Sequence, residues 1–255
     1  MPELEELQLG YNENFGDAGM RALFEGLGRS ALPSLRNLFL YEVQLGPAGA
    51  EVLAAALRQG AMPQVEKLQL GSNRLGNQGL SRLNGLLRKL PNLDGLYLGD
   101  NGIDDEGVAS LVANLRKDDF KKLEQLDLNA NIVADKSSAT LESAIRNGLF
   151  PAMGELTLCK SWQESGVNVS GLSDEALKSL DGALAARPFL QYEPAEDFES
   201  LLEEARELLG PLTRFEVIKA LRNNDGNVHE AMNELIRATG HEPAEEDEES
   251  DSADF

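Results

Sequence analysis

A hydrophobic pattern with a period of about thirty residues runs through most of the chain. The motif apolar-x-x-apolar-x-apolar begins at Leu4, Leu35, Val65, Leu93, Leu123 and Met153. The intervals between these starts are 31, 30, 28, 30 and 30 residues. Such even spacing predicts a stack of similar structural units, because one such unit cannot bury its apolar face alone.

The periodicity changes within each unit. The central apolar pair, such as Leu38 and Leu40, alternates with other positions, which predicts a short strand with one buried face. A turn that often reads Gly-x-x-Gly follows, and then apolar residues take helical spacing, as at Met20, Leu23, Phe24 and Leu27. We therefore predict an α/β solenoid of about six strand–turn–helix units over residues 1–190. Parallel strands would line the concave side, and helices the convex side.

A different pattern follows the repeats. Residues 191–196 (QYEPAE) predict a linker, and residues 197–239 predict a small all-α bundle of three short helices. The Gly210–Pro211 pair ends the first of these helices, and Gly226 ends the second. Residues 240–255 form an acidic, low-complexity tail that holds too little apolar surface to fold, so we expect it to be disordered.

The repeats resemble the long, ribonuclease-inhibitor type of leucine-rich repeat. Asparagine recurs after the strand motif at Asn12, Asn73, Asn101 and Asn131. The resemblance implies an asparagine ladder, in which side-chain amides satisfy backbone groups in the turns between repeats. Val43 and Ser161 interrupt this ladder, so we expect the backbone of the second and sixth units to be looser or differently satisfied.

The stretch from Lys219 to Ile236 resembles the second and third helices of a ubiquitin-associated domain, and most closely the one in the alpha chain of the nascent polypeptide-associated complex. The resemblance implies a contact surface for ubiquitin or another protein, and a purely intramolecular role is the alternative. Its expected residues are Leu209, Gly210 and Pro211 in the first loop, with Leu235 and Ile236 near the end of the last helix. The first loop lacks the aromatic residue that ubiquitin-binding members usually carry, which places ubiquitin binding in doubt.

Charge and composition limit the classes of partner and of chemistry that we expect. The formal net charge of −21 disfavours nucleic acid and anionic membranes as direct partners. The single cysteine allows no internal disulfide, which suits a cytoplasmic or nuclear location. No motif places a nucleophile beside a base, a metal-ligand set or a phosphate-binding loop. We therefore expect a non-catalytic protein that needs no cofactor or metal.

The strand pattern also predicts an interaction face. Side chains between the strand leucines should face the concave side in two columns, which contain the candidate partner-binding residues Phe39, Tyr41, Gln69, Tyr97 and Asp127. Exposed aromatics are typical anchors of protein interfaces, although they could also merely cover the sheet. Gly71 and Gly99 should leave a groove beside them that a partner side chain could enter.

The resulting hypothesis is a protein-interaction adaptor with two binding modules. One alternative is a GTPase-activating protein, because the repeats and acidic tail together resemble the Ran GTPase-activating protein. The short repeat array and the helical domain depart from that family. A second alternative, implied by the nascent-chain resemblance, is a factor associated with the ribosome or with nascent chains.

Overall fold

The structure is a computed structural model that describes residues 3–158, 172–186, 205, 209, 214–224 and 228–238. The chain divides into two compact units, residues 1–187 and residues 188–255. The first unit contains the repeats. The second contains helices α8 and α9. The predicted linker 191–196 and the tail 240–255 lie outside the described residues.

The first unit contains a parallel sheet of six three-residue strands that follow sequence order. The strands are β1 (Glu6–Gln8), β2 (Asn37–Phe39), β3 (Lys67–Gln69), β4 (Gly95–Tyr97), β5 (Gln125–Asp127) and β6 (Glu155–Thr157). The register pairs equivalent residues of successive repeats, so Leu38 lies opposite Leu7 and Leu68. The described residues therefore confirm the predicted parallel stack of strands.

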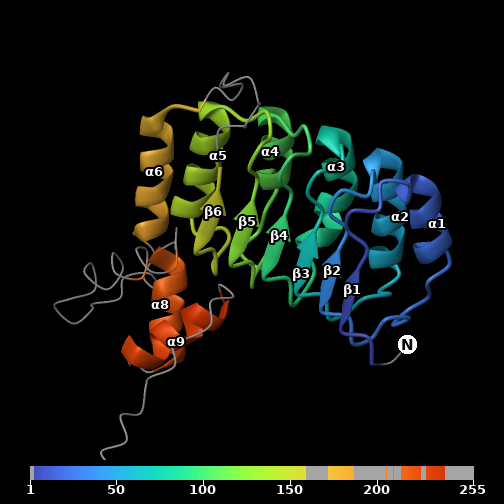
Figure 1. Ribbon diagram of the computed structural model, residues 1–255. Coiled ribbons are helices and arrows are strands. Elements are labelled where there is room, and N and C mark those ends of the chain that lie inside the picture. Colours follow the sequence, from blue (N-terminus) through green and yellow to red (C-terminus); the bar gives the residue numbers. More distant parts are fainter. Residues whose placement is uncertain are drawn as a thin grey trace, which may run out of the picture. The chain divides into compact units, whose positions relative to one another are not determined.

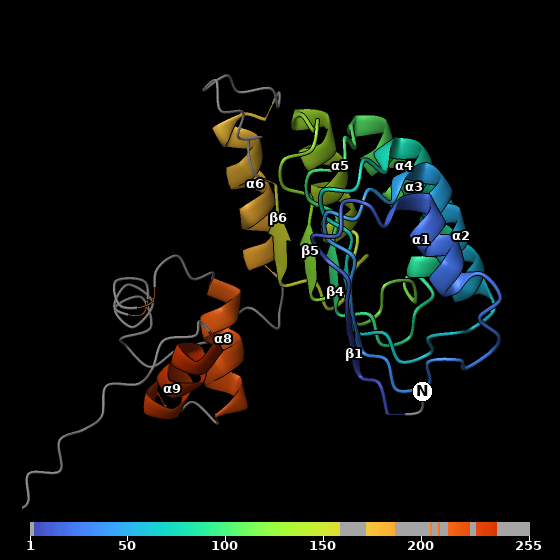
Figure 2. The same ribbon diagram turned by 45° about the vertical axis from the view of Figure 1, so that its right-hand side comes forward.

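A helix follows every strand of the sheet, and the helices cover one of its faces (Figures 1 and 2). They are α1 (Gly16–Phe24), α2 (Gly46–Arg58), α3 (Gly76–Leu87), α4 (Asp105–Val112), α5 (Asp135–Arg146) and α6 (Asp174–Ala185). The prediction that Gly-x-x-Gly forms a turn before the helix was wrong. Its first glycine begins the helix in units one to three, with a left-handed φ of +55° at Gly46.

The core lies between the sheet and the helices. Strand leucines such as Leu38 and Leu68 are at most 1% exposed, as are helix residues such as Met20 and Phe24 on the predicted stripe. Leu7 in β1 is only half-buried, because no described strand pairs with the outer edge of β1. Burial in the inner repeats therefore comes from neighbouring repeats on both sides, as the solenoid prediction requires.

The asparagine ladder is present and connects successive repeats. The Asn73 Oδ1 accepts hydrogen bonds from the backbone N–H groups of Val43 (3.0 Å) and Leu45 (3.2 Å) in the preceding repeat. Its Nδ2 donates to the Leu70 carbonyl oxygen of its own repeat at 2.9 Å. The same pattern recurs at Asn101 and Asn131. Each amide satisfies buried backbone groups that have no strand or helix partner.

The break in the ladder affects a different unit from the one expected. The backbone N–H of Val43 is satisfied by Asn73, so the second unit keeps its support. The first unit loses the side-chain part of this support, because valine has no side-chain oxygen to accept from the turn around Asn12; the Val43 backbone carbonyl still accepts from the Gly16 N–H at 2.8 Å. The exposed Asn12 side chain donates only within its own turn, to the carbonyl oxygens of Leu9 (2.7 Å) and Gly10 (3.2 Å). Ser161 lies outside the described residues.

The second unit contains α8 (Arg214–Asn223) and α9 (Val228–Ala238), which pack together. Their buried residues are Val217, Ala220, Leu221, Ala231 and Leu235. The Glu234 carboxylate of α9 accepts hydrogen bonds from the side-chain amides of Asn223 (2.8 Å) and Asn224 (2.7 Å) at the end of α8. Of the first predicted helix, only Ala205 and Leu209 are described, and both are helical. The three-helix bundle therefore stays a prediction.

Candidate functional site

The register of the sheet aligns one column of candidate residues. Phe39, Gln69, Tyr97 and Asp127 occupy equivalent strand positions, together with Gln8 and Thr157 at the ends. The alternating leucines point into the core, so this column lies on the face of the sheet away from α1–α6. Its four central residues are half-buried. The predicted column is thus present in the predicted order.

Tyr41 continues this face beyond the end of β2. Its ring packs against that of Tyr11, with centroids 5.2 Å apart. It also covers Gly71, where an added Cβ atom would lie 2.9 Å from the Tyr41 Cδ2. The expected groove beside Gly71 is therefore filled by Tyr41. The space beside Gly99 is likewise occupied, since an added Cβ would lie 3.1 Å from the Asp127 Oδ2.

Tyr97 lies over its own strand. An added Cβ at Gly95 would lie 2.9 Å from the Tyr97 Cε2, so the ring fills the space that a side chain at position 95 would take. The Tyr97 hydroxyl donates to the Gln125 Oε1 at 2.7 Å. The Gln125 Nε2 in turn donates to the Glu155 Oε2 at 2.8 Å. This chain of hydrogen bonds fixes side chains across β4, β5 and β6.

Asp127 is held in place beside this chain of hydrogen bonds. Its Oδ1 accepts hydrogen bonds from the Thr157 hydroxyl at 3.0 Å and from the Asn129 backbone N–H at 2.8 Å. A cavity of about 220 Å³ lies here, lined by Tyr97, Gln125, Leu126, Asp127, Asn129, Glu155 and Thr157. Two of the five candidate residues, Tyr97 and Asp127, therefore share one pocket.

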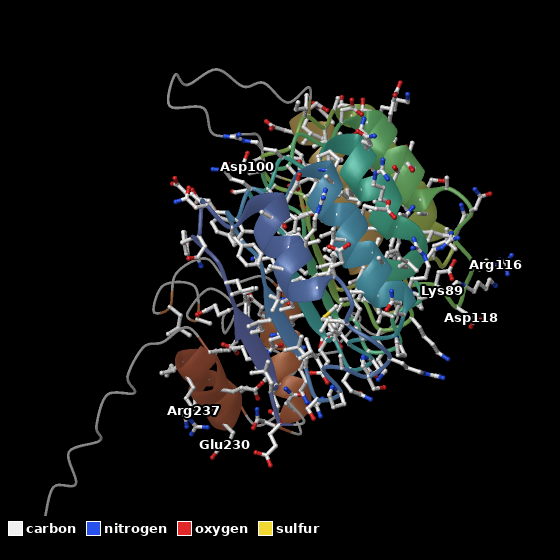
Figure 3. All side chains as sticks on the ribbon, turned by 90° about the vertical axis from the view of Figure 1, so that its right-hand side faces the viewer. Lys89, Asp100, Arg116, Asp118, Glu230 and Arg237 are labelled. Atoms are coloured by element: carbon white, nitrogen blue, oxygen red, sulfur yellow. The ribbon has the colours of Figure 1, made fainter. Side chains whose placement is uncertain are left out.

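Sequence reasoning missed the loops that join strands to helices. A larger open cavity of about 720 Å³ is lined by Glu13, Tyr41, Glu42, Gln44, Ser72, Arg74, Gly76, Asp100, Asn101 and Gly102. The backbone is left-handed at Glu42, Ser72 and Asp100, the residues before each ladder position, with φ of 51° to 53°. Asp100, labelled in Figure 3, accepts a hydrogen bond from the Ser72 hydroxyl at 2.9 Å. The polar residue that directly precedes these ladder positions recurs in the sequence, and this recurrence could have indicated the cavity.

A buried carboxylate was also missed. Asp119 is 2% exposed and forms ion pairs with Lys89 and, at 3.8 Å, with Arg88. Burial disfavours ionisation, but hydrogen bonds from Lys89 and the Arg116 backbone N–H, with the nearby positive charges, outweigh it and lower the pKa of Asp119. Figure 3 shows Lys89, Arg116 and Asp118 at this edge of the repeat unit. This group connects repeats rather than forming a reactive site.

The predicted surface of the helical unit is described only in part. Leu235 is 5% exposed, so it belongs to the packed interior between α8 and α9. Ile236 and Leu209 are half-buried, and Gly210 and Pro211 lie outside the described residues. Figure 3 marks Glu230 and Arg237, two exposed charged residues of α9. Of the expected hydrophobic pair, Ile236 alone is partly accessible.

The described residues contain neither a candidate metal site nor a candidate membrane-spanning helix. No group of three or more His, Cys, Asp or Glu side chains in that part of the chain is placed to hold a metal ion. No helix there has the length and hydropathy that crossing a bilayer requires.

Comparison with known proteins supports the repeat assignment. A family model described as Leucine Rich repeat matches residues 2–24 and 89–112. These segments end with α1 and α4 and contain β1 and β4, so they coincide with the first and fourth structural units. No curated protein matches the chain. The family model thus identifies leucine-rich repeats in two of the six strand–helix units that are stacked along the parallel sheet.

Proposed function

We propose that this protein is an interaction adaptor that binds a protein partner on the sheet face opposite α1–α6, the concave face. The observation that carries this proposal is the column of half-buried residues from Phe39 to Asp127, aligned in register across neighbouring strands. Leucine-rich-repeat domains generally mediate protein–protein interactions. Repeat lengths of 28 to 31 residues further support the ribonuclease-inhibitor type of repeat.

The aromatic residues of this face have the properties of interface anchors. Phe39, Tyr41 and Tyr97 are partly exposed. Phe39 ends β2, Tyr97 ends β4, and Tyr41 lies two residues after β2. Tyr41 and Tyr97 rest on glycine positions, so little side-chain freedom remains to be lost when a partner binds. Rigid aromatic side chains of this kind dominate the binding energy of many interfaces.

The test is affinity capture with the full chain, comparing wild type with the variant Phe39→Ala/Tyr41→Ala/Tyr97→Ala. We expect the triple variant to lose its specific partners, with affinity reduced by about tenfold or more, because anchor truncations often cost 2 kcal/mol or more. Thermal unfolding of both proteins checks that the repeats stay folded. The single variant Phe39→Ala leaves in place the two tyrosine rings that cover glycines. It should also lower the affinity for the partner, but by less than the triple variant does.

A matched control carries three alanine substitutions on exposed helix residues: Arg21→Ala, Gln78→Ala and Lys178→Ala. These positions lie on α1, α3 and α6, in the layer on the other side of the sheet. This control should retain every partner. If the concave-face variant captures the same partners as wild type while the control loses them, the binding face has been assigned to the wrong side.

We further propose that the helical unit provides a second protein contact, with ubiquitin as the first candidate. The support is the resemblance of residues 219–236 to ubiquitin-associated helices and the partial exposure of Ile236. Titration of the isotope-labelled full chain with ubiquitin, followed by NMR, should shift the amide signals of α9 around Ile236. Shifts confined to the repeats, or none at millimolar ubiquitin, would rule ubiquitin out as the ligand of this unit.

A further inference from the structure

The strand motifs of the sheet have an uneven distribution of charge. The strand motifs around β4, β5 and β6 (residues 93–99, 123–129 and 153–158) contain Asp94, Glu124, Asp127 and Glu155, and no lysine or arginine. The motifs around β1, β2 and β3 contain three acidic and two basic residues. In that first half, Arg36 and Glu66 already neutralise each other in an ion pair. Counted over these motifs, the half of the sheet formed by β4–β6 is therefore the more acidic one.

The 220 Å³ pocket beside Tyr97 lies in this acidic half. Its volume is below the roughly 300 to 1,000 Å³ of typical small-molecule sites. It suits the end of one side chain from a partner protein. Its lining includes the carboxylates of Asp127 and Glu155 and the ring of Tyr97, a combination of negative charge and an aromatic surface.

The groups of this pocket are held in fixed positions before any ligand binds. The Asp127 Oδ1 is anchored by Thr157 and Asn129, so the carboxylate cannot rotate freely. The Tyr97 ring lies over Gly95, and its hydroxyl is held by the hydrogen bond to Gln125. A pocket with pre-positioned groups loses less entropy on binding.

We propose that this pocket receives an arginine side chain from the protein partner. A guanidinium group is planar and always charged, and its N–H groups can donate to a carboxylate oxygen while its plane stacks on an aromatic ring. Asp127 supplies the carboxylate through its Oδ2, because its Oδ1 already accepts two hydrogen bonds, and Tyr97 supplies the ring. Lysine offers a compact charge without the planar fork, so it fits the same pocket less well. This inference rests on the proposed binding function and names the chemistry that the face selects.

The test uses the probe peptide Ac-Gly-Ser-Arg-Ser-Gly-NH2 and two matched peptides with citrulline or lysine in place of arginine. The isotope-labelled full chain is titrated by NMR at about 150 mM salt, where long-range charge effects are screened. We expect the arginine peptide to shift the amide signals of Asp127 and Asn129. The citrulline peptide, which keeps the shape and lacks the charge, should leave them unchanged, and the lysine peptide should bind several-fold more weakly.

Two variants separate the pocket from the general acidity of the face. Asp127→Asn should weaken binding of the arginine peptide by about tenfold, because a charge-assisted hydrogen bond is lost. The control Glu124→Gln removes one negative charge from the same strand motif, outside the pocket lining, and should weaken binding of the arginine peptide by no more than about twofold.

The pocket assignment fails if citrulline binds as well as arginine, if both variants weaken binding equally, or if no peptide shifts these amides at 20 mM (about the weakest binding such a contact allows). The proposed function fails separately, if the triple aromatic variant keeps all partners. The triple variant could lose its partners while Asp127→Asn keeps full affinity for both peptide and partner. That result would support the binding face and contradict the arginine pocket.

Discussion

At the scale of single residues, the ladder asparagines are polar but contribute to the stability of the fold through buried hydrogen bonds to the backbone. Asn101 is 2% exposed, and its Oδ1 accepts hydrogen bonds from the backbone N–H groups of Asn73 (3.1 Å) and Leu75 (3.2 Å). Its Nδ2 donates to the Leu70 and Leu98 carbonyl oxygens. With the Gly99 carbonyl oxygen, to which its Nδ2 also donates at 3.1 Å, this one side chain satisfies five backbone groups in two repeats.

Replacing Asn101 with alanine should therefore lower the free energy of unfolding of the repeat unit by about 3 kcal/mol, because buried donors and acceptors lose their partners. Urea unfolding followed by circular dichroism measures the change. Asn12→Ala is the control: the same chemical change at an exposed ladder position should cost less than about 1 kcal/mol. Equal losses at the two positions would contradict the structural role assigned to the inner ladder.

The buried carboxylate of Asp119 predicts how stability depends on pH. Its pKa is lowered below the ordinary value of 3.8, and the pKa of Asp104 is lowered as well, first by its hydrogen bond with Asn77. A carboxyl group with a lower pKa in the folded state stabilises the fold at pH above its unfolded value. That stabilisation is lost as the pH falls through the folded value.

We therefore expect the urea midpoint of wild type to be constant near neutral pH and to fall as the pH drops below about 4. Asp119→Asn should lower the midpoint at pH 7 and flatten this acid-dependent fall, since its charge no longer titrates. Asp118→Asn, at the exposed neighbouring position shown in Figure 3, is the control and should reproduce the wild-type profile. A wild-type curve that rises on acidification would show that the sign is wrong.

At the scale of elements, carboxylates at helix starts connect one repeat to the next. Asp104 caps α4, where its Oδ1 accepts hydrogen bonds from the backbone N–H groups of Glu106 (2.8 Å) and Gly107 (3.3 Å). Asp105 reaches into the next repeat, where it accepts from the backbone N–H groups of Ala134 (3.0 Å) and Ser137 (3.1 Å) at the start of α5. This acidic run therefore both begins α4 and supports the start of the helix in the next repeat.

Asp105→Ala should consequently destabilise the repeats by about 1 to 2 kcal/mol, since α5 loses its capping acceptor. The neighbouring Glu106→Ala removes an exposed carboxylate from the same turn and should change stability by less than about 0.5 kcal/mol. Thermal unfolding of both variants against wild type gives the comparison. A larger loss for Glu106→Ala than for Asp105→Ala would refute the capping of α5 across the repeat boundary.

At the scale of the whole molecule, sequence reasoning predicted the parallel stack of strand–helix units because a repeat pattern specifies it many times over, whereas the three-helix bundle stays a prediction. The thirty-residue period fixed the strands, the alternation fixed which side chains line the concave face, and equal spacing fixed the register. It failed where a side chain fills space on a neighbouring strand. That Tyr41 covers Gly71 depends on a side-chain rotamer, which the order of residues does not reveal.

The same limit applies to the pocket in the acidic half of the face. Tyr97 and Asp127 were each predicted to face a partner, but their grouping with Glu155 and Gln125 depends on hydrogen bonds across three strands. The interruption of the ladder at Val43 was visible in the sequence, yet its effect falls one repeat earlier, because each asparagine supports the repeat that precedes it.

Site-specific photocrosslinking tests most directly whether partners bind the concave face. A benzophenone amino acid would be placed at position 39 on β2 and, in a second protein, at position 78 on α3, which is exposed in the helical layer. We predict partner crosslinks from position 39 and none from position 78. Crosslinks from position 78 with none from position 39 would contradict the concave-face binding that the register of the sheet supports.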